Sequence, residues 1–438
     1  MVDVPIALSP RGGATVANAA LPSLPVDRPL TAPPGFHVLA KPSGPICNLD
    51  CSYCFFLEKE KLYPGDRFRM ADDVLRSYIR QVIESQLTPE VTIAWQGGEP
   101  TLMGVGFFRR AVAYAEECAG SGRTLHHTIQ TNGTLLSDEW CEFLGEKQFL
   151  VGISIDGPEH LHDVYRVDKQ GRPTFARVRA GLGRLTHHGV EWNVLCAVHA
   201  ANQDAPLEVY RYFRDELGAQ FIQFIPIVER VDEHRPELTD RSVGSEAWGR
   251  FLTTVFDEWV RRDVGEVFVQ MFDAALASWY GVAPALCIFG ETCGDAVALE
   301  HNGDLYSCDH FVDPEHLLGN ITETHMVELL ASPAQRSFGT AKRDTLPRLC
   351  RECPVLFACR GECPKNRVAL TPDGEAGLNH LCAGYFHFFN HIDGLMQLMA
   401  GSLRRGGLAG EVMTVLSAAG RNDPCPCGNG RKTKHCHG

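Results

Sequence analysis

Two patterns of apolar residues alternate along most of the chain, helical spacing and short continuous runs. Around Ala71–Ser85, for example, Val74, Tyr78 and Val82 would share one face of a helix. The apolar runs predict strands at Phe36–Lys41, Val91–Trp95, Thr128–Gln130, Leu150–Ile155, Trp192–Val198 and Phe221–Ile227. Helical spacing lies between them, at residues 71–85, 106–119, 138–145, 175–187 and 206–217. This alternation indicates an α/β fold, a partial (β/α)6 barrel over residues 36–235 with its chemistry at the C-terminal ends of the strands.

The segments outside this barrel have different patterns. Residues 1–35 are rich in Ala and Pro and show no periodicity, which predicts a flexible N-terminal lead. Residues 236–285 are predicted to form a helical connector, because their apolar positions share one face. Residues 286–395 read as a small cysteine-rich domain of short strands and loops, residues 396–420 as a helical linker, and residues 421–438 as a separate tail.

Composition and charge narrow the class of protein. The 438 residues are 44% hydrophobic and 22% charged, which is ordinary for a globular protein. The formal net charge of −13 argues against a nucleic-acid partner. No apolar run is long enough for a membrane span, and no secretory signal pattern is present, so we expect a cytoplasmic location. In a reducing compartment the 17 cysteines, grouped at short spacings, indicate bound metal rather than disulfides.

The first cysteine group follows the first predicted strand. Cys47, Cys51 and Cys54 stand in one short loop. Three thiolates can hold three irons of a [4Fe–4S] cluster and leave the fourth iron open to a cofactor. A zinc loop is the alternative, although the loop contains no fourth Cys or His. The stretch resembles the C-x3-C-x2-C signature of radical S-adenosylmethionine (SAM) enzymes, whose core fold is the same partial barrel.

A glycine-rich turn follows the next predicted strand. Gln96-Gly97-Gly98-Glu99-Pro100 resembles the GGEP motif of radical SAM enzymes, which implies that its backbone and Glu99 hold the amino group of SAM. An ordinary Gly-Gly turn is the alternative. Resemblance to one family of this class, the anaerobic sulfatase-maturating enzymes, implies further SAM contacts from Phe56, Gln96, Ser154, Arg166 and Ile227. Phe56 departs from the family pattern, in which a relative has Tyr.

Eight further cysteines lie between residues 287 and 382. Eight thiolates are what two fully ligated four-iron clusters require, and two zinc ribbons are the alternative. The spacing resembles the SPASM domain, the auxiliary-cluster module of peptide-modifying radical SAM enzymes. That resemblance implies an inner cluster on Cys287, Cys293, Cys308 and Cys363, and an outer cluster on Cys350, Cys353, Cys359 and Cys382. With the first group, the chain would hold three [4Fe–4S] clusters.

An acidic residue, Asp309, follows Cys308 immediately. In a water-poor site beside a cluster, a carboxylate can act as a base. Asp309 matches the aspartate that serves as general base in anaerobic sulfatase-maturating enzymes, where it takes the proton from the target Cys or Ser side chain. The alternative is a residue that orients a cluster thiolate.

The tail carries a Cys3His set, Cys425, Cys427, Cys436 and His437, on a segment too short to bury a core without metal. These residues predict a zinc site, and the segment resembles the SEC-C motif. The basic side chains of Arg421, Arg431, Lys432 and Lys434 would suit docking on an acidic or ribosomal surface, and a structural end-cap without a partner is the alternative.

Together the resemblances imply an anaerobic sulfatase-maturating enzyme, a radical SAM oxidoreductase that oxidises a Cys or Ser of an unfolded sulfatase polypeptide to Cα-formylglycine. A 5′-deoxyadenosyl radical would take a hydrogen atom from the substrate Cβ. Asp309 would accept the side-chain proton, and the auxiliary clusters would accept the remaining electron. A reduced flavodoxin- or ferredoxin-like protein would donate electrons, and neither nucleic acid nor membrane is an expected partner. One alternative is a SPASM maturase that forms thioether bonds or crosslinks in another ribosomal peptide. A zinc-binding adaptor without catalytic activity is the other.

Overall fold

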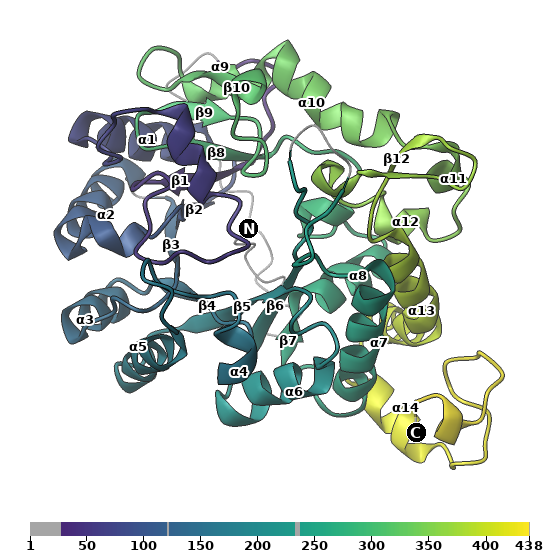
Figure 1. Cartoon of the computed structure of the whole chain (residues 1–438). Helices are drawn as coiled ribbons and strands as arrows, with labels where there is room; N and C mark the ends of the chain where they lie inside the picture. The colour runs from purple at the N-terminus through teal and green to yellow at the C-terminus, as the bar shows by residue number, and fades with distance from the viewer. Residues whose placement is uncertain (1–27, 121, 233–236, 438) are drawn as a thin grey trace.

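One curved sheet organises the computed structural model, which describes residues 28–120, 122–232 and 237–437 (Figure 1). Its strands are β1 (His37–Lys41), β2 (Glu90–Trp95), β3 (Thr124–Thr131), β4 (Leu150–Ser154), β5 (Trp192–Val198), β6 (Phe221–Pro226), β7 (Phe268–Val269), β8 (Ala296–Glu300), β9 (Asp304–Tyr306) and β10 (Leu317–Asn320). The strand order is β10-β9-β8-β1-β2-β3-β4-β5-β6-β7. The strands from β8 through β1 to β7 are parallel neighbours, and β9 and β10 continue the sheet antiparallel. A separate hairpin consists of β11 (Ala369–Leu370) and β12 (Ala376–Leu378).

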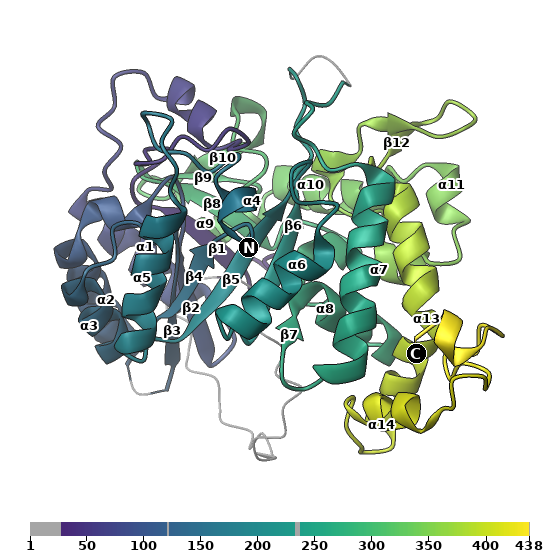
Figure 2. The ribbon, with the colours of Figure 1, turned by 60° about the horizontal axis from the view of Figure 1, so that its bottom comes forward.

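Helices cover the outer side of the sheet (Figures 1 and 2). Those of the barrel and its connector are α1 (Asp72–Ser85), α2 (Val105–Ala119), α3 (Asp138–Glu146), α4 (Glu159–His162), α5 (Phe175–His187), α6 (Pro206–Arg211), α7 (Ser245–Arg262) and α8 (Gln270–Tyr280). The later helices are α9 (Met326–Ala331), α10 (Pro333–Asp344), α11 (Arg348–Arg351), α12 (Leu356–Cys359), α13 (Cys382–Arg404) and α14 (Glu411–Ala418). Of the helices in the described part of the chain, none is long and apolar enough to cross a lipid bilayer.

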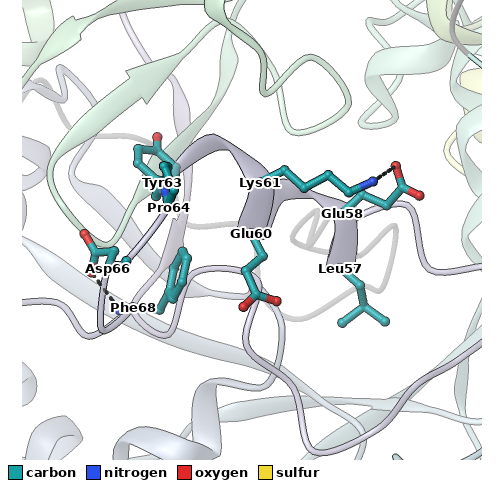
Figure 3. Close-up of a pocket in the computed structure, with 9 residues that line it drawn as sticks. Leu57, Glu58, Glu60, Lys61, Tyr63, Pro64, Asp66 and Phe68 are labelled. Carbon is teal, nitrogen blue, oxygen red and sulfur yellow. Dashed lines mark hydrogen bonds and ion pairs between the residues drawn. The ribbon is translucent and has the colours of Figure 1, made fainter.

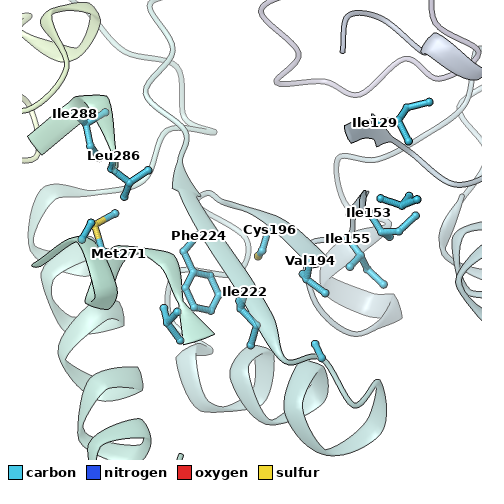
Figure 4. Packing of buried hydrophobic residues seen from close by; sticks show 14 of the residues in the cluster. Ile129, Ile153, Ile155, Val194, Cys196, Ile222, Phe224, Met271, Leu286 and Ile288 are labelled. Carbon is cyan, nitrogen blue, oxygen red and sulfur yellow. The ribbon is translucent and has the colours of Figure 1, made fainter. Parts of the chain in front are cut away.

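Strands and helices share one apolar core. In α1, Tyr78 and Val82 are fully buried on one face, while Asp72 lies in the first turn, where the helix dipole favours an acidic side chain. Figure 4 shows the same packing at β6, whose Phe224 lies near α8 and its buried Met271. Removing these surfaces from water drives the closure of helices onto the sheet.

The strands and helices predicted for the barrel are present with their ends shifted, except that the helix predicted at 206–217 is α-helical only to Arg211 and continues as a π-helix over Tyr212–Glu216. The expectation of short strands and loops over residues 286–395 is wrong in two respects. That region also contains α9 to α12, and its strands β8 to β10 extend the barrel sheet. The pattern concealed α10 because its buried residues include Gln335, Gly339 and Lys342, which form no apolar stripe.

Of the predicted flexible lead, residues 1–27 lie outside the described residues. Arg28 donates hydrogen bonds to the backbone oxygens of Ser85 and Pro33. Thr31 Oγ1 donates to Ala331 O, at the end of α9, at 3.3 Å. Residues 28–35 therefore contact the C-terminal ends of α1 and α9.

Two long helices, α7 and α13, pack side by side away from the barrel mouth. Ser245 Oγ accepts from the backbone nitrogen of Gly384 at 3.2 Å. Farther along, the rings of Phe256 and Phe388 lie with their centroids 6.3 Å apart. Since α13 begins at Cys382, this helix pair supports one of the predicted cluster ligands.

Candidate active site

The loop that carries Cys47, Cys51 and Cys54 begins at the C-terminal end of β1 and folds back on the barrel. Two backbone hydrogen bonds, of 2.8 and 3.0 Å, join it to residues 165–167. Burial raises the pKa of Cys47 and of Cys51 to about 12. Thiols with such pKa values lose their protons at neutral pH only when a metal takes the proton's place. Cys47 and Cys51 would therefore become thiolate ligands only when they bind the metal of a cluster.

The glycine-rich turn packs directly on the cysteine loop. Gly98 N donates to Gly44 O at 2.8 Å, and Glu99 N donates to Ile46 O at 2.9 Å. A Cβ atom on Gly98 would lie only 2.2 Å from Ile46 O. Glycine at this position therefore serves the close approach of two protein segments.

The Glu99 carboxylate is fully buried and already bonded. Its Oε1 accepts from Thr101 N at 3.0 Å, Thr101 Oγ1 at 2.6 Å and Thr131 Oγ1 at 2.7 Å. Its Oε2 accepts from Asn132 N at 2.8 Å. This side chain thus holds the ends of β2 and β3 together, a role that the motif did not reveal. Pro100 beside it is also buried.

Polar side chains line the inner face of the sheet. Gln130, Gly152 and Asn193 are register partners across β3, β4 and β5, so they share one face. Gln130 Nε2 donates to Ser154 Oγ at 3.0 Å. Several buried atoms on this face lack a hydrogen-bond partner within the described ranges: Gln96 Nε2, Gln130 Oε1, Asn193 Oδ1 and Gln223 Oε1. Because buried polar groups are almost always paired, these atoms indicate a polar ligand inside the barrel.

A buried ion pair lies beside the cysteine loop. Arg166 Nε donates to Asp156 Oδ2 at 2.8 Å, and the hydroxyl of Tyr53 donates to the same oxygen. Ala197 N donates to Asp156 Oδ1 at 2.9 Å, and His199 Nε2 lies 3.6 Å from Oδ2. Burial alone would raise the pKa of Asp156, but the Arg166 guanidinium and His199 hold it well below its usual range. Asp156 is therefore an anion that fixes the position of Arg166.

Two further predicted SAM contacts, Phe56 and Ile227, follow β1 and β6, the first and last strands of the predicted barrel. Phe56 is 4% exposed, and Lys41 Nζ lies 4.2 Å from the centroid of its ring. Ile227 N donates to Val198 O at 2.8 Å, and Ile227 O accepts from Val243 N at 2.9 Å. Its backbone is thus paired with neighbouring segments, and its side chain is half-buried.

Cys287, Cys293, Cys308 and Cys363 lie close to one another. Burial and the nearby Cys287 and Cys293 thiols raise the pKa of Cys308 to about 12. Burial, with Cys308 and Cys287 as neighbours, also raises the pKa of Cys363. Lys342 Nζ donates to three backbone oxygens of the segment that begins at Cys287, at 2.7, 2.8 and 2.6 Å. The four thiols are the set that the SPASM resemblance implies for the inner cluster, with a buried cation beside them.

Cys350, Cys353, Cys359 and Cys382 form a second group. Burial raises the pKa of Cys359 to about 12, with Cys382 and Cys350 among the neighbours that contribute. Burial, with Cys350 and Cys353 as neighbours, raises the pKa of Cys382 to about 11. The structure therefore gathers the four residues implied for the outer cluster.

An ion pair joins the auxiliary region to the barrel. Lys41, the last residue of β1, has a side chain that is 2% exposed, and its ammonium pairs with the carboxylate of Asp309, which is 17% exposed. Burial would raise the pKa of Asp309, but the Lys41 ammonium outweighs it and lowers that pKa to about 2. The predicted base thus lies, ionised, next to the strand that leads into the radical loop.

The tail ligands converge away from this site. The ligand atoms of Cys425, Cys427, Cys436 and His437 all lie within 4.8 Å of one another. Cys427 Sγ and Cys436 Sγ are 3.5 Å apart, and His437 Nδ1 lies 3.3 Å from Cys425 Sγ and 3.1 Å from Cys436 Sγ. Tetrahedral zinc, with bonds of about 2.3 Å to sulfur and 2.0 Å to nitrogen, separates neighbouring ligand atoms by about 3.5–3.8 Å. The set therefore fits zinc after a small expansion.

A cavity of about 440 Å³ lies along residues 57–68, just after the radical loop (Figure 3). Tyr63 and Phe68 line it, and Lys61 Nζ pairs with Glu58 at 3.4 Å on its rim. None of the predicted site residues lines this cavity. It is formed by one surface segment and is not part of the candidate active site.

The structure thus adds residues that the sequence patterns did not single out. Lys41 could have been noticed as a charged residue that ends an apolar strand, and Asp156 as a carboxylate within Ser154-Ile155-Asp156-Gly157. Asn193 and Gln223 gave no such signal, because an amide within an apolar strand becomes informative only when its neighbours leave it unpaired.

Comparison with known proteins defines the class. Residues 42–213 match the radical SAM superfamily, and residues 287–354 match SPASM, an iron–sulfur cluster-binding domain. The parallel barrel, the three-cysteine loop and the cysteine-rich region that extends the sheet agree with both matches. This protein is a radical SAM enzyme with a SPASM module.

Relatives along nearly the whole chain define the family. The chain is 46% identical over 394 residues to the serine-type anaerobic sulfatase-maturating enzyme of Bacteroides thetaiotaomicron, covering 87% of this chain and 95% of that protein. It is 30% identical to the cysteine-type enzyme of Clostridium perfringens, covering 82% and 96%. The solved structure described as native anSMEcpe with bound AdoMet and Cp18Cys peptide superimposes with a TM-score of 0.76, at 30% identity, over 84% of this chain and 100% of that chain. The chain belongs to the anaerobic sulfatase-maturating enzymes.

Proposed function

We propose that this enzyme converts a Cys or Ser side chain of an unfolded sulfatase polypeptide into Cα-formylglycine. The observation that carries the proposal is the Lys41–Asp309 ion pair. It brings a carboxylate of the auxiliary region to the strand that leads into the radical loop. This supports hydrogen abstraction from Cβ and removal of the proton from the attached Oγ or Sγ at one substrate residue. The 46% identity to a serine-type relative and the 30% identity to a cysteine-type relative support both substrates.

The residues present fit SAM and iron–sulfur clusters. Cys47, Cys51 and Cys54 would hold the cluster that binds SAM, and the unpaired amide atoms of the inner sheet face suit a polar cofactor. When bound, these groups supply a 5′-deoxyadenosyl radical that abstracts hydrogen, and acceptors for the electron left over. The proposed SAM contacts are Phe56, Gln96, Gly97, Gly98, Glu99, Pro100, Ser154, Arg166 and Ile227. We assign the amino group of SAM to the turn backbone and to Glu99, whose Oε2 accepts one hydrogen bond and keeps acceptor capacity.

Asp309 is the proposed proton acceptor. Oxidation to the aldehyde level removes from the substrate a Cβ hydrogen atom, the Oγ or Sγ proton and one electron, and hydrolysis of the thioaldehyde from Cys then releases hydrogen sulfide. A carboxylate that the Lys41 ammonium keeps ionised is a weak base towards an ordinary hydroxyl or thiol. It suits a proton that becomes acidic once Cβ has lost its hydrogen atom. Lys41 keeps the acceptor ionised and oriented.

Three further assignments complete the proposal. The inner and outer cysteine groups would each hold a [4Fe–4S] cluster, which makes three clusters in all. The tail would hold zinc through Cys425, Cys427, Cys436 and His437. A reduced flavodoxin- or ferredoxin-like protein would supply the electron that starts the reaction.

Mass spectrometry of small peptides tests the reaction. A Cys-x-Pro-x-Arg peptide and its Ser counterpart are incubated anaerobically with reconstituted enzyme, SAM and a strong reductant. Formylglycine appears as a loss of about 18 Da from the Cys peptide and about 2 Da from the Ser peptide, with 5′-deoxyadenosine as co-product. A variant with Cys47, Cys51 and Cys54 replaced by Ala is the matched control and should form neither product.

Each other outcome contradicts a definite part of the proposal. Deoxyadenosine without a change in either peptide would mean another peptide substrate, such as one for thioether formation. A fully loaded, reduced enzyme that cleaves no SAM would contradict radical chemistry by this chain.

A further inference from the structure

The C-terminal tail lies against the helix pair α7 and α13 (Figure 2). His437 Nε2 is 3.4 Å from Asp257 Oδ1 of α7. The same oxygen is 2.6 Å from Nε2 of His391, which belongs to α13. The carboxylate therefore accepts a hydrogen bond from the imidazole of His391 on α13 and lies within ion-pair distance of the imidazole of His437 in the tail.

A second contact joins the tail to α13 through the backbone. A Cβ atom on Gly394 would lie 1.8 Å from Cys427 O. The tail therefore rests directly on the backbone of α13 at this point, and only glycine leaves room for it. Gly401, one of the other glycines of α13, differs, because a Cβ atom there would meet only the flexible end of Arg405, at 3.2 Å.

The ring of His437 connects these contacts to the proposed metal. Its Nδ1 faces the Cys425 and Cys436 thiols, at 3.3 and 3.1 Å, while its Nε2 faces Asp257. The ring is 1% exposed. When one nitrogen of a histidine binds a metal, a carboxylate on the other nitrogen fixes the ring's orientation and tautomer. Asp257 occupies that position.

We propose that the zinc-bound tail is a metal-dependent clamp that fastens α7 to α13, with Asp257 as the positioning residue for His437. The inference rests on the proposed zinc site and deepens it by assigning the site an intramolecular partner. Because α13 begins at Cys382, the clamp steadies the helix that carries a proposed outer-cluster ligand. Without zinc, three thiols and an imidazole lose their common anchor, and the tail separates from both helices.

Hydrogen exchange read by mass spectrometry, with zinc content measured in parallel, tests the clamp on the full-length, cluster-loaded chain. Asp257→Ala keeps all four proposed zinc ligands and suits a helix. We expect it to retain about one zinc per chain with affinity lowered about 10–100-fold, and to speed amide exchange in residues 421–437. Glu246→Ala, on the exposed side of the same helix, is the matched control and should change neither quantity.

A second variant separates the clamp from any folding defect. Gly394→Ala strengthens the helix intrinsically but places a methyl group where the tail backbone lies. Exchange should rise in the tail while zinc stays bound, and Gly401→Ala should leave exchange unchanged.

The zinc site and the clamp fail in different ways. Wild-type protein without zinc, or Cys436→Ser that still binds it normally, would overturn the proposed site. Zinc-bound Asp257→Ala and Gly394→Ala with wild-type exchange in the tail would overturn the clamp alone. A second zinc per chain that Asp257→Ala removes would make Asp257 a ligand and contradict its positioning role.

Discussion

Two carboxylates in this enzyme each pair with a buried cation beside a proposed cluster, and they are bonded very differently. Asp156 is fully buried and accepts from Tyr53, Arg166 and a backbone nitrogen. Asp309 is 17% exposed and has one ion-pair partner in the part of the chain that the structure describes, Lys41. Both carboxylates have a lowered pKa, so charge alone does not distinguish them.

The difference lies in the lone pairs that remain. Every donor near Asp156 belongs to the barrel, so that carboxylate is spent on holding Arg166 and the radical loop in place. Asp309 joins two regions and keeps acceptor capacity for a substrate proton. We therefore assign a structural role to the carboxylate whose lone pairs are engaged within the protein, and a role in proton transfer to the carboxylate that keeps acceptor capacity.

Asp309→Asn should have the largest effect. The amide cannot accept a proton as a carboxylate does, so formylglycine formation should fall by about 10²–10⁴-fold. Formation of 5′-deoxyadenosine should persist, because the SAM site is untouched, and the ratio of the two products measures the uncoupling. Asp309→Glu should recover part of the activity. Equal loss of both products would instead make Asp309 part of the SAM or cluster scaffold.

Asp156→Asn should act on stability. It leaves the Arg166 guanidinium buried without its counter-charge, which lowers the free energy of unfolding by about 3–5 kcal/mol. Urea unfolding of the cluster-free chain, followed by circular dichroism, measures this loss. Asp72→Asn is the control, since its ion pairs are half-exposed and should contribute less than about 1 kcal/mol. A stable Asp156→Asn protein that no longer cleaves SAM would contradict the structural role and show that this carboxylate is needed for SAM cleavage.

The sequence predicted the barrel well because its helices and strands carry plain periodic patterns, as α1 and α5 show. It predicted the cysteine groups because metal ligation imposes short spacings that resemble known modules. It did not predict that β8 would pair with β1, since that contact joins residues 37–41 to 296–300 and leaves no local signal.

The site residues that escaped prediction share one physical cause. The importance of Lys41 depends on Asp309, which lies far along the chain, and that of Asp257 depends on the tail. When the fold brings an ionic or hydrogen-bonding partner from a distant part of the chain, the local sequence pattern does not indicate that partner. Glu99 illustrates the converse, because its motif predicts a ligand contact while the fold adds hydrogen bonds within the protein that the motif does not reveal.

Lys41→Met tests whether the Lys41 ammonium, the cation paired with Asp309, is needed for formylglycine formation. A charge-assisted hydrogen bond contributes about 1.5–3 kcal/mol, so formylglycine formation should fall about 10–100-fold, less than for the Asp309 variant. Lys41→Arg keeps the charge and should recover part of the loss. The double variant with Asp309→Asn should be no worse than Asp309→Asn alone, because Lys41 acts through that carboxylate. Additive losses would contradict this coupling.

Tyr53→Phe should have the smallest effect and gives the finest test of the comparison. It removes one of the donors to Asp156 and leaves Arg166 and the Ala197 backbone in place. The bond from the hydroxyl to the ionised Asp156 is charge-assisted, and such bonds contribute about 1.5–3 kcal/mol. Because the other donors remain, we expect a loss near the lower limit, and urea unfolding measures it. SAM cleavage should stay near wild type, since Arg166 keeps its partner. A large loss of SAM cleavage with normal stability would show that the hydroxyl positions the neighbouring cysteine loop, and the Asp156–Arg166 pair could then no longer be called purely structural.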